Sequence, residues 1–121
     1  MTQHDDSSVQ ALLPLSATVL QMLLALCEGE RHGYALKREL ARRTNGRLNP
    51  GPGVLYGSIN KMLELGMIEE SAQRPDAHLD DERRRYYRIT AFGRRVAEAE
   101  AIRMRDLVRL AADNLGLPDL A

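Results

Sequence analysis

The chain has 121 residues, the usual length of one domain, and a formal net charge of zero. Hydrophobic residues make up 44% and charged residues 28%, which excludes a wholly disordered chain. No apolar run reaches the roughly 18 residues of a membrane-spanning helix. The N-terminal segment has no lysine or arginine before Arg31, whereas a secretory signal is expected to begin with basic residues. The single cysteine, Cys27, cannot form a disulfide within the chain, which suits a reducing compartment. We therefore expect a cytoplasmic protein.

The N-terminal third predicts a short leading segment and two helices. Residues 1–13 are expected to form a tail or a short helix. Ser16 is placed to cap a first long helix that is apolar on almost every side and ends at Gly29, so it should be buried by its own domain or by a partner chain. A second helix is expected over about residues 33–43, ended by the pair at 45–46, Asn-Gly.

The middle of the chain predicts a third helix and a β hairpin. Pro52 suits the first position of the helix, which should end before Gly66. Residues 67–73 and 84–89 flank a Pro- and Asp-rich loop, and the second segment alternates between two faces, as in a hairpin. The order helix, helix, helix, hairpin is that of a winged helix-turn-helix.

Thr90 is placed to cap a long final helix that should run to about Leu115. The fold class expected is therefore mainly α with a small β hairpin. A winged helix-turn-helix would occupy residues 14–90, and a helix for dimerisation would occupy residues 91–121.

Charge is unevenly distributed along this neutral chain. Residues 31–61 hold seven basic residues and one acid, and residues 83–95 hold six arginines and no acid. Two such segments can give one positive face that binds nucleic acid. Charge runs are also typical of solvated surfaces, so the pattern alone leaves both interpretations open.

Four stretches in order resemble the PadR family of bacterial transcriptional regulators. They are HGYAL at 32–36, GPGVLY at 51–56, LGMIE at 65–69 and RYYRIT at 85–90, followed by Gly93. The resemblance covers about residues 14–95, and the short C-terminal region resembles the smaller subfamily. It implies a repressor that binds DNA as a homodimer, and it allows release by a small hydrophobic or phenolic effector.

Two features depart from the family pattern. Val54 stands where family members commonly have threonine, which removes a hydroxyl contact to DNA. The wing tip, residues 75–82, carries four carboxylates, which phosphate should repel. We therefore expect the arginines at 83–85, behind the tip, to contact DNA rather than the tip itself.

The third helix is expected to enter the major groove with its N-terminus first. Its Gly-Pro-Gly start either lets backbone N–H groups approach phosphate or serves only the turn. Asn60 suits an adenine edge, Val54 a thymine methyl and Lys61 phosphate or guanine, whereas Tyr56 either contacts DNA or packs in the core. Residues of the second helix would contact the DNA backbone, and the wing arginines would do so or line a solvated strand edge. The predicted DNA-binding residues are Tyr34, Lys37, Gly53, Val54, Tyr56, Asn60, Lys61, Arg83, Arg84 and Arg85.

Apolar residues of the final helix recur at alternating spacings of four and three, as in a coiled coil. Little of the domain remains to cover this stripe, so we expect it to pack on a second copy of the chain, with the apolar first long helix as acceptor. Packing within one chain is the alternative. The predicted dimer residues are Val19, Leu23, Ala97, Ala101, Met104, Val108, Ala111 and Leu115.

No other chemistry is indicated by the sequence. The three histidines and Cys27 lack the spacing of metal ligands, and no nucleophile–base set or phosphate-binding loop is present, so we expect neither a metal nor a cofactor nor an enzyme. The main rival function is a winged-helix module that binds an acidic protein and shows no preference for a DNA sequence.

Overall fold

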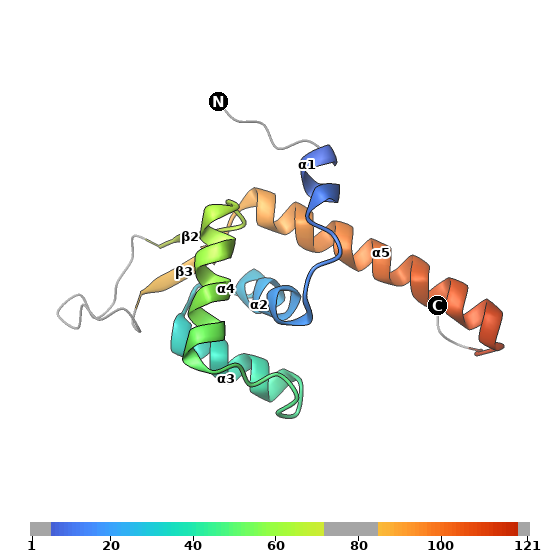
Figure 1. The fold of residues 1–121 in the computed structure, drawn as a ribbon, viewed down its shortest axis with the longest axis horizontal. Coiled ribbons are helices and arrows are strands. Elements are labelled where there is room, and N and C mark those ends of the chain that lie inside the picture. Colours follow the sequence, from blue (N-terminus) through green and yellow to red (C-terminus); the bar gives the residue numbers. More distant parts are fainter. Residues whose placement is uncertain (1–5, 72–84, 119–121) are drawn as a thin grey trace.

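The computed structural model describes residues 6–71 and 85–118. The elements in chain order are α1 (Asp6–Ala11), α2 (Ala17–Cys27), β1 (Arg31–His32), α3 (Gly33–Arg43), α4 (Pro52–Glu64), β2 (Ile68–Glu70), β3 (Tyr86–Ile89) and α5 (Ala91–Leu115) (Figure 1). The predicted fold class is confirmed: a short leading helix, three further helices, a small antiparallel wing and a long final helix. No helix in the described ranges is long and apolar enough to span a bilayer.

Capping residues set the ends of the long helices where the sequence predicts them. The Ser16 hydroxyl accepts the Val19 N–H at 3.1 Å, and the Thr90 hydroxyl accepts the Gly93 N–H at 3.0 Å. Each side chain satisfies a backbone donor that the first helical turn leaves without a partner. At the other end of α5, Gly116 adopts a left-handed φ of 65°, which favours glycine.

The wing is a three-stranded antiparallel sheet in the order β1-β3-β2. The predicted hairpin of β2 and β3 is present, with Ile68 opposite Ile89. The sequence did not predict β1, because a strand of two residues is too short to show alternation. Its second residue, His32, pairs with Tyr86, and its Nδ1 also accepts the Ala35 N–H at 3.1 Å. One residue thus ends β1 and caps α3, which joins the base of the wing to that helix.

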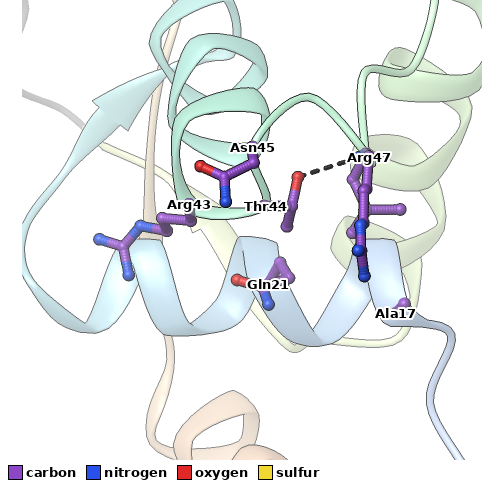
Figure 2. A pocket seen from close by; sticks show the side chains of 7 residues that line it. Ala17, Gln21, Arg43, Thr44, Asn45 and Arg47 are labelled. Carbon is purple, nitrogen blue, oxygen red and sulfur yellow. Dashed lines mark hydrogen bonds between the residues drawn. The ribbon is translucent and has the colours of Figure 1, made fainter.

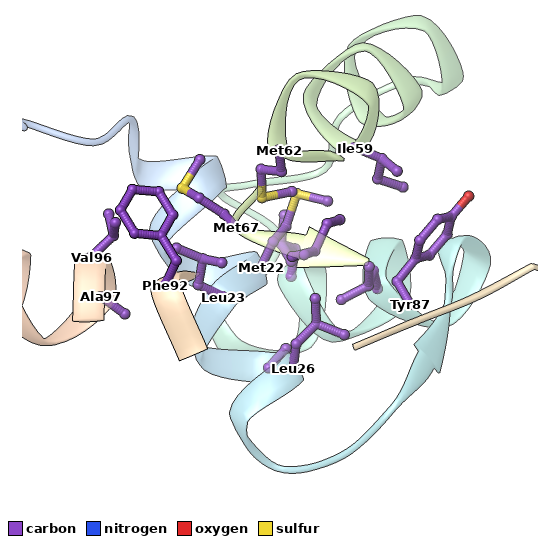
Figure 3. Packing of buried hydrophobic residues seen from close by; sticks show 14 of the residues in the cluster. Met22, Leu23, Leu26, Ile59, Met62, Met67, Tyr87, Phe92, Val96 and Ala97 are labelled. Atoms are coloured by element: carbon purple, nitrogen blue, oxygen red, sulfur yellow. The ribbon is translucent and has the colours of Figure 1, made fainter. Parts of the chain in front are cut away.

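The core lies around α2, against which α3, α4, α5 and β3 pack. Figure 3 shows aliphatic and thioether side chains from these elements meeting, with Phe92 and Tyr87 at its margins. The chain has no tryptophan, so leucine and methionine supply most of the buried volume. Met22, Ile59 and Met62 are fully buried, which fixes α4 on α2 with one face inward.

Helix α5 divides into two halves. Its first half packs against α1, α2 and β3, and its buried residues end at Glu100. All ten residues from 101 to 110 are exposed, and Figure 1 shows this half extending away from the rest of the fold.

Candidate nucleic-acid interface

Helix α4 has one buried face and one bare face. Leu55, Ile59 and Met62 hold it in the core. The opposite face exposes Gly53, Val54, Gly57, Asn60 and Lys61, and Val54 is 61% exposed. A β carbon added at Gly53 or Gly57 would meet nothing within 4 Å, so neither glycine is needed for packing. The described part of the protein gives no packing role to this face.

The start of α4 is open. Pro52 occupies its first turn, Gly51 is the N-cap, and no described side chain caps the helix. A helix N-terminus carries a partial positive charge, and small residues let another molecule approach it closely.

The predicted contacts on α3 lie at the surface near this start. Tyr34 is 53% exposed, and the Arg38 guanidinium lies 6.0 Å from its ring centre. The Lys37 ammonium donates to the Asn49 side chain at 2.8 Å, which ties α3 to the loop before α4. Lys37 therefore also has a structural role that the sequence did not reveal.

Tyr56 is half-buried, and its ring packs on α3. A β carbon at Gly33 would lie 3.0 Å from the ring carbon Cε1 and 3.0 Å from the hydroxyl of Tyr56. Because Gly33 has no side chain, it leaves the space that the Tyr56 ring occupies. The packing interpretation holds for the ring, and a DNA contact by Tyr56 stays a prediction.

Acidic residues neutralise part of the first basic segment. Glu39 accepts from Arg42 at 2.8 Å and Arg43 at 2.9 Å, and Glu28 pairs with Arg31 and Arg43. The hydrogen bonds from Arg42 and Arg43 lower the pKa of Glu39 to about 2. Within the described ranges, the cations of this segment without an ion pair are Lys37, Arg38, Arg47 and Lys61. The positive charge therefore concentrates around α3, the following loop and α4.

The second basic segment is also partly paired. Arg88 lies between Glu69, at 2.9 Å, and Glu30, at 3.8 Å. Arg85 is exposed and lies 3.9 Å from Glu70. Counting charges along the sequence overestimated the positive charge of the wing, because these acids come from outside the segment. Arg83, Arg84 and the acidic tip fall outside the described residues.

The predicted dimer residues separate into buried and exposed groups. Leu23 is 0% and Ala97 4% exposed, so the prediction that they face a partner is wrong: they hold α5 on α2 inside one protomer. Val19 is half-buried against the same core. Met104, Val108 and Leu115 are exposed at 44%, 43% and 69%, with Ala101 exposed and Ala111 half-buried beside them.

Sequence reasoning missed the exposure of Leu24 on α2, next to the buried Leu23. Leu107 and Leu110, which flank the predicted stripe in the sequence, are exposed on α5 and widen it. The signal for Leu24 was available, because a helix apolar on every side must leave some side chain outside its own core.

A polar hollow of about 490 Å³ lies between the start of α2 and the loop after α3. Figure 2 shows the Arg47 side chain pointing toward Ala17, with Thr44 between Arg47 and Asn45 and with Gln21 below them. The Thr44 hydroxyl accepts the Leu48 N–H at 2.9 Å, which holds the loop around the hollow. Its lining does not suit a hydrophobic effector.

Comparison with known proteins decides the family. The model of the transcriptional regulator PadR-like family matches residues 22–99, which run from the middle of α2 through α3, α4 and the wing to the first part of α5. The chain belongs to the PadR-like family. A relative in Lysinibacillus sphaericus, named only as uncharacterized protein X, is 31% identical over 80 residues, which are 66% of this chain and 68% of that protein.

Solved structures share the PadR-like fold. A transcriptional regulator from Clostridium thermocellum matches with a TM-score of 0.65 at 18% identity, and the aligned region covers 91% of this chain and 95% of that protein. RosR from H. salinarum has a TM-score of 0.60 at 24% identity and covers 88% of this chain and 99% of its own. At these identities the likeness concerns the fold alone.

The Glu39 ion pairs predict an acid-dependent loss of stability. Because the folded state lowers the pKa of Glu39 from 4.5 to about 2, its contribution is present above pH 4.5 and is lost as the pH falls toward 2. Glu39→Gln should lower Tm by roughly 2 °C at pH 7 and by nothing near pH 2, in melts followed by circular dichroism. Glu64→Gln, at an exposed site without an ion pair in the described ranges, is the control. An equal Tm difference at both pH values would contradict this role of the Glu39 charge.

Proposed function

We propose that this PadR-like protein is a cytoplasmic transcriptional repressor that binds a pseudo-palindromic DNA operator as a homodimer. The observation that carries the proposal is the bare face of α4, which displays Val54, Asn60 and Lys61 at an open helix start. Placing α4 in the major groove gives this face a function.

The exposed side chains of α4 suit base edges. An asparagine such as Asn60 binds adenine through two hydrogen bonds, a valine methyl packs on thymine, and a lysine binds guanine or phosphate. Gly53 and Gly57 leave bare backbone between them, so the helix can lie close to the DNA. Tyr34, Lys37 and Arg38 of α3 would contact the phosphate backbone and fix the orientation of α4.

Dimerisation would use the exposed half of α5. Met104, Leu107 and Val108 form an exposed apolar stripe, and contiguous exposed apolar side chains are typical of a surface that binds another protein. A second copy offers a matching α5 and the exposed Leu24 on α2. A two-fold dimer can place two α4 helices on one side of DNA, about 34 Å apart.

An effector would bind where the two protomers meet. The family resemblance allows a small hydrophobic compound, and the apolar surfaces of α2 and the exposed half of α5 suit one better than the polar hollow beside Arg47. Membership of a regulator family also supports the expectation that the chain is not an enzyme.

Binding-site selection from fragmented genomic DNA with the purified protein tests the proposal. We expect enrichment of an inverted repeat whose half-sites lie about one helical turn apart, at 10–10.5 base pairs. A module that binds only acidic proteins would enrich no sequence, and that result would overturn the proposal.

Asn60→Ala tests how α4 reads DNA. We expect the substitution to cut discrimination at one adenine position by about tenfold, because each bidentate contact contributes roughly 1–3 kcal/mol, and to leave affinity for random DNA unchanged. Fluorescence titration with single-base operator variants gives both values. Asn114→Ala, an exposed asparagine on α5, is the control. Equal weakening on every sequence would show that Asn60 positions the protein and does not read a base.

A further inference from the structure

Glu100 is a buried carboxylate, and the proposed binding of DNA does not explain why it is buried. It is 1% exposed and is the last residue of α5 that the protomer buries. Glu100 occupies a place on the buried face of α5, where Phe92, Val96 and Ala97 are apolar. Burying a charge is costly unless it is paired and hydrogen-bonded, so a leucine here would pack at lower cost.

The carboxylate of Glu100 binds two groups. One oxygen, Oε2, accepts the Leu15 backbone N–H at 2.9 Å, across 85 residues of sequence. Arg103 donates its Nε to Oε1 at 2.5 Å and its Nη2 to Oε2 at 3.2 Å. Arg103 thus holds the carboxylate in the orientation in which it meets Leu15. The hydrogen bond from Arg103 has the larger effect and that from Leu15 the smaller, and together they keep the pKa of Glu100 below its ordinary value.

This contact joins the start of α2 to the point where α5 leaves the protomer. Leu15 directly precedes Ser16, the N-cap of α2, and the exposed half of α5 begins at Ala101. Apolar packing on α2 is not directional and allows a helix to tilt, whereas a hydrogen bond to a fixed backbone group is directional.

A small tilt at Glu100 has a large effect at the far end of α5. The 15 residues that follow Glu100, up to Leu115, span about 22 Å at about 1.5 Å per residue. A change of about 10° in direction therefore moves the end of α5 by about 4 Å. If α5 is held in a dimer, the same tilt instead turns the rest of each protomer, including α4, about the point at Glu100. The tilt therefore changes the separation of the two α4 helices, and DNA is sensitive to that separation because one base pair rises about 3.4 Å.

We propose that Glu100 is a positioning residue whose bonds to Leu15 and Arg103 fix the angle between α5 and the winged helix and thereby select the half-site spacing of the operator. This inference rests on the proposed function, because it needs a dimer that binds two half-sites. It adds a residue that touches neither DNA nor the partner and yet limits which operators are bound.

Operators of altered spacing test the inference. The selected operator is compared with variants lengthened or shortened by one base pair at its centre, by fluorescence titration. Each added base pair rotates one half-site by about 35°, so the wild type should lose affinity about tenfold. Glu100→Ala should keep its affinity for random DNA and reduce the tenfold difference to about twofold or less. Glu100→Gln, which can still accept the Leu15 N–H, should lie nearer the wild type.

Glu98→Ala is the matched control, because Glu98 is exposed on the same helix and has no ion pair in the described ranges. Glu98→Ala should show the same tenfold difference in affinity between the selected operator and its spacing variants as the wild type. If Glu100→Ala does not fold, Arg103→Gln replaces it, since Arg103 is 41% exposed and its loss frees the carboxylate to turn. We expect Arg103→Gln to reduce the tenfold difference in affinity between the selected operator and its spacing variants to about threefold. A folded, dimeric Glu100→Ala, or Arg103→Gln in its place, that retains the full tenfold difference overturns the inference.

A measurement without DNA separates this inference from the proposed function. Spin labels at Glu64→Cys, at the end of α4 in a Cys27→Ser background, report the separation of the two α4 helices in the dimer. Glu100→Ala should broaden that distance distribution, and Glu98→Ala should not. A wild type that is dimeric but prefers no operator would contradict the proposed function, whereas an unchanged distribution in Glu100→Ala would contradict only the role of Glu100.

Discussion

Met104→Glu combined with Val108→Glu should convert the proposed dimer to a monomer. Both side chains lie on the exposed half of α5, so the substitutions leave the protomer core intact. In a dimer they would bring carboxylates together in an apolar interface, where unpaired charge is costly. Sedimentation velocity should give the mass of one chain, and affinity for a two-half-site operator should fall at least about 100-fold, because linked half-site binding is lost.

A charge-matched variant controls for electrostatics. Arg105→Gln combined with Arg109→Gln also changes the formal charge by two negative units per chain, at the same spacing, about 100° around the helix axis. This variant should remain dimeric. If the glutamate pair sediments as a dimer with undiminished operator affinity, the exposed half of α5 is not the dimer contact.

Gly93→Ala should destabilise the fold strongly. A β carbon at Gly93 would lie 2.0 Å from the Met67 carbonyl oxygen and 2.8 Å from its carbon. That oxygen accepts hydrogen bonds from both the backbone N–H and the hydroxyl of Thr90. It cannot move without breaking these hydrogen bonds, which connect the wing to the start of α5. We expect a loss of about 2 kcal/mol or more and a Tm lower by roughly 8 °C or more, at equal protomer concentration.

Gly57→Ala is the matched control for Gly93→Ala. Gly57 also lies within a helix, but a β carbon there meets nothing within 4 Å. Alanine should therefore stabilise the protein by about 0.5–1 kcal/mol, because glycine loses more conformational freedom when a helix forms. Similar Tm values for the two variants would contradict the close packing of α5 on the backbone of Met67.

The sequence predicted those elements whose ends carry their own chemistry. Ser16, Pro52 and Thr90 start helices through local capping or a preset φ, and Gly116 ends one through its left-handed conformation. These effects act within a few residues, so they can be inferred without the fold. The bare face of α4 followed in the same way from the spacing of its buried residues.

Other features depend on contacts between distant parts of the chain and could not be predicted. Glu100 stands among small and acidic residues that look solvent-exposed, and only its contact with Leu15 shows that it is buried. Likewise Leu23 and Leu24 are indistinguishable in an apolar run, and the fold alone decides which one is exposed. The pairing of Glu28 with Arg43 and of Glu30 with Arg88 explains why charge counts along the sequence misjudged the surface.

The central claim is tested most directly by titrating the protein against its selected operator and against a scrambled duplex of equal length, over a range of salt concentrations. We predict a preference of at least about 10³-fold for the operator, with log affinity falling linearly as log salt rises. Equal affinity for the two duplexes at every salt concentration would contradict a sequence-specific repressor.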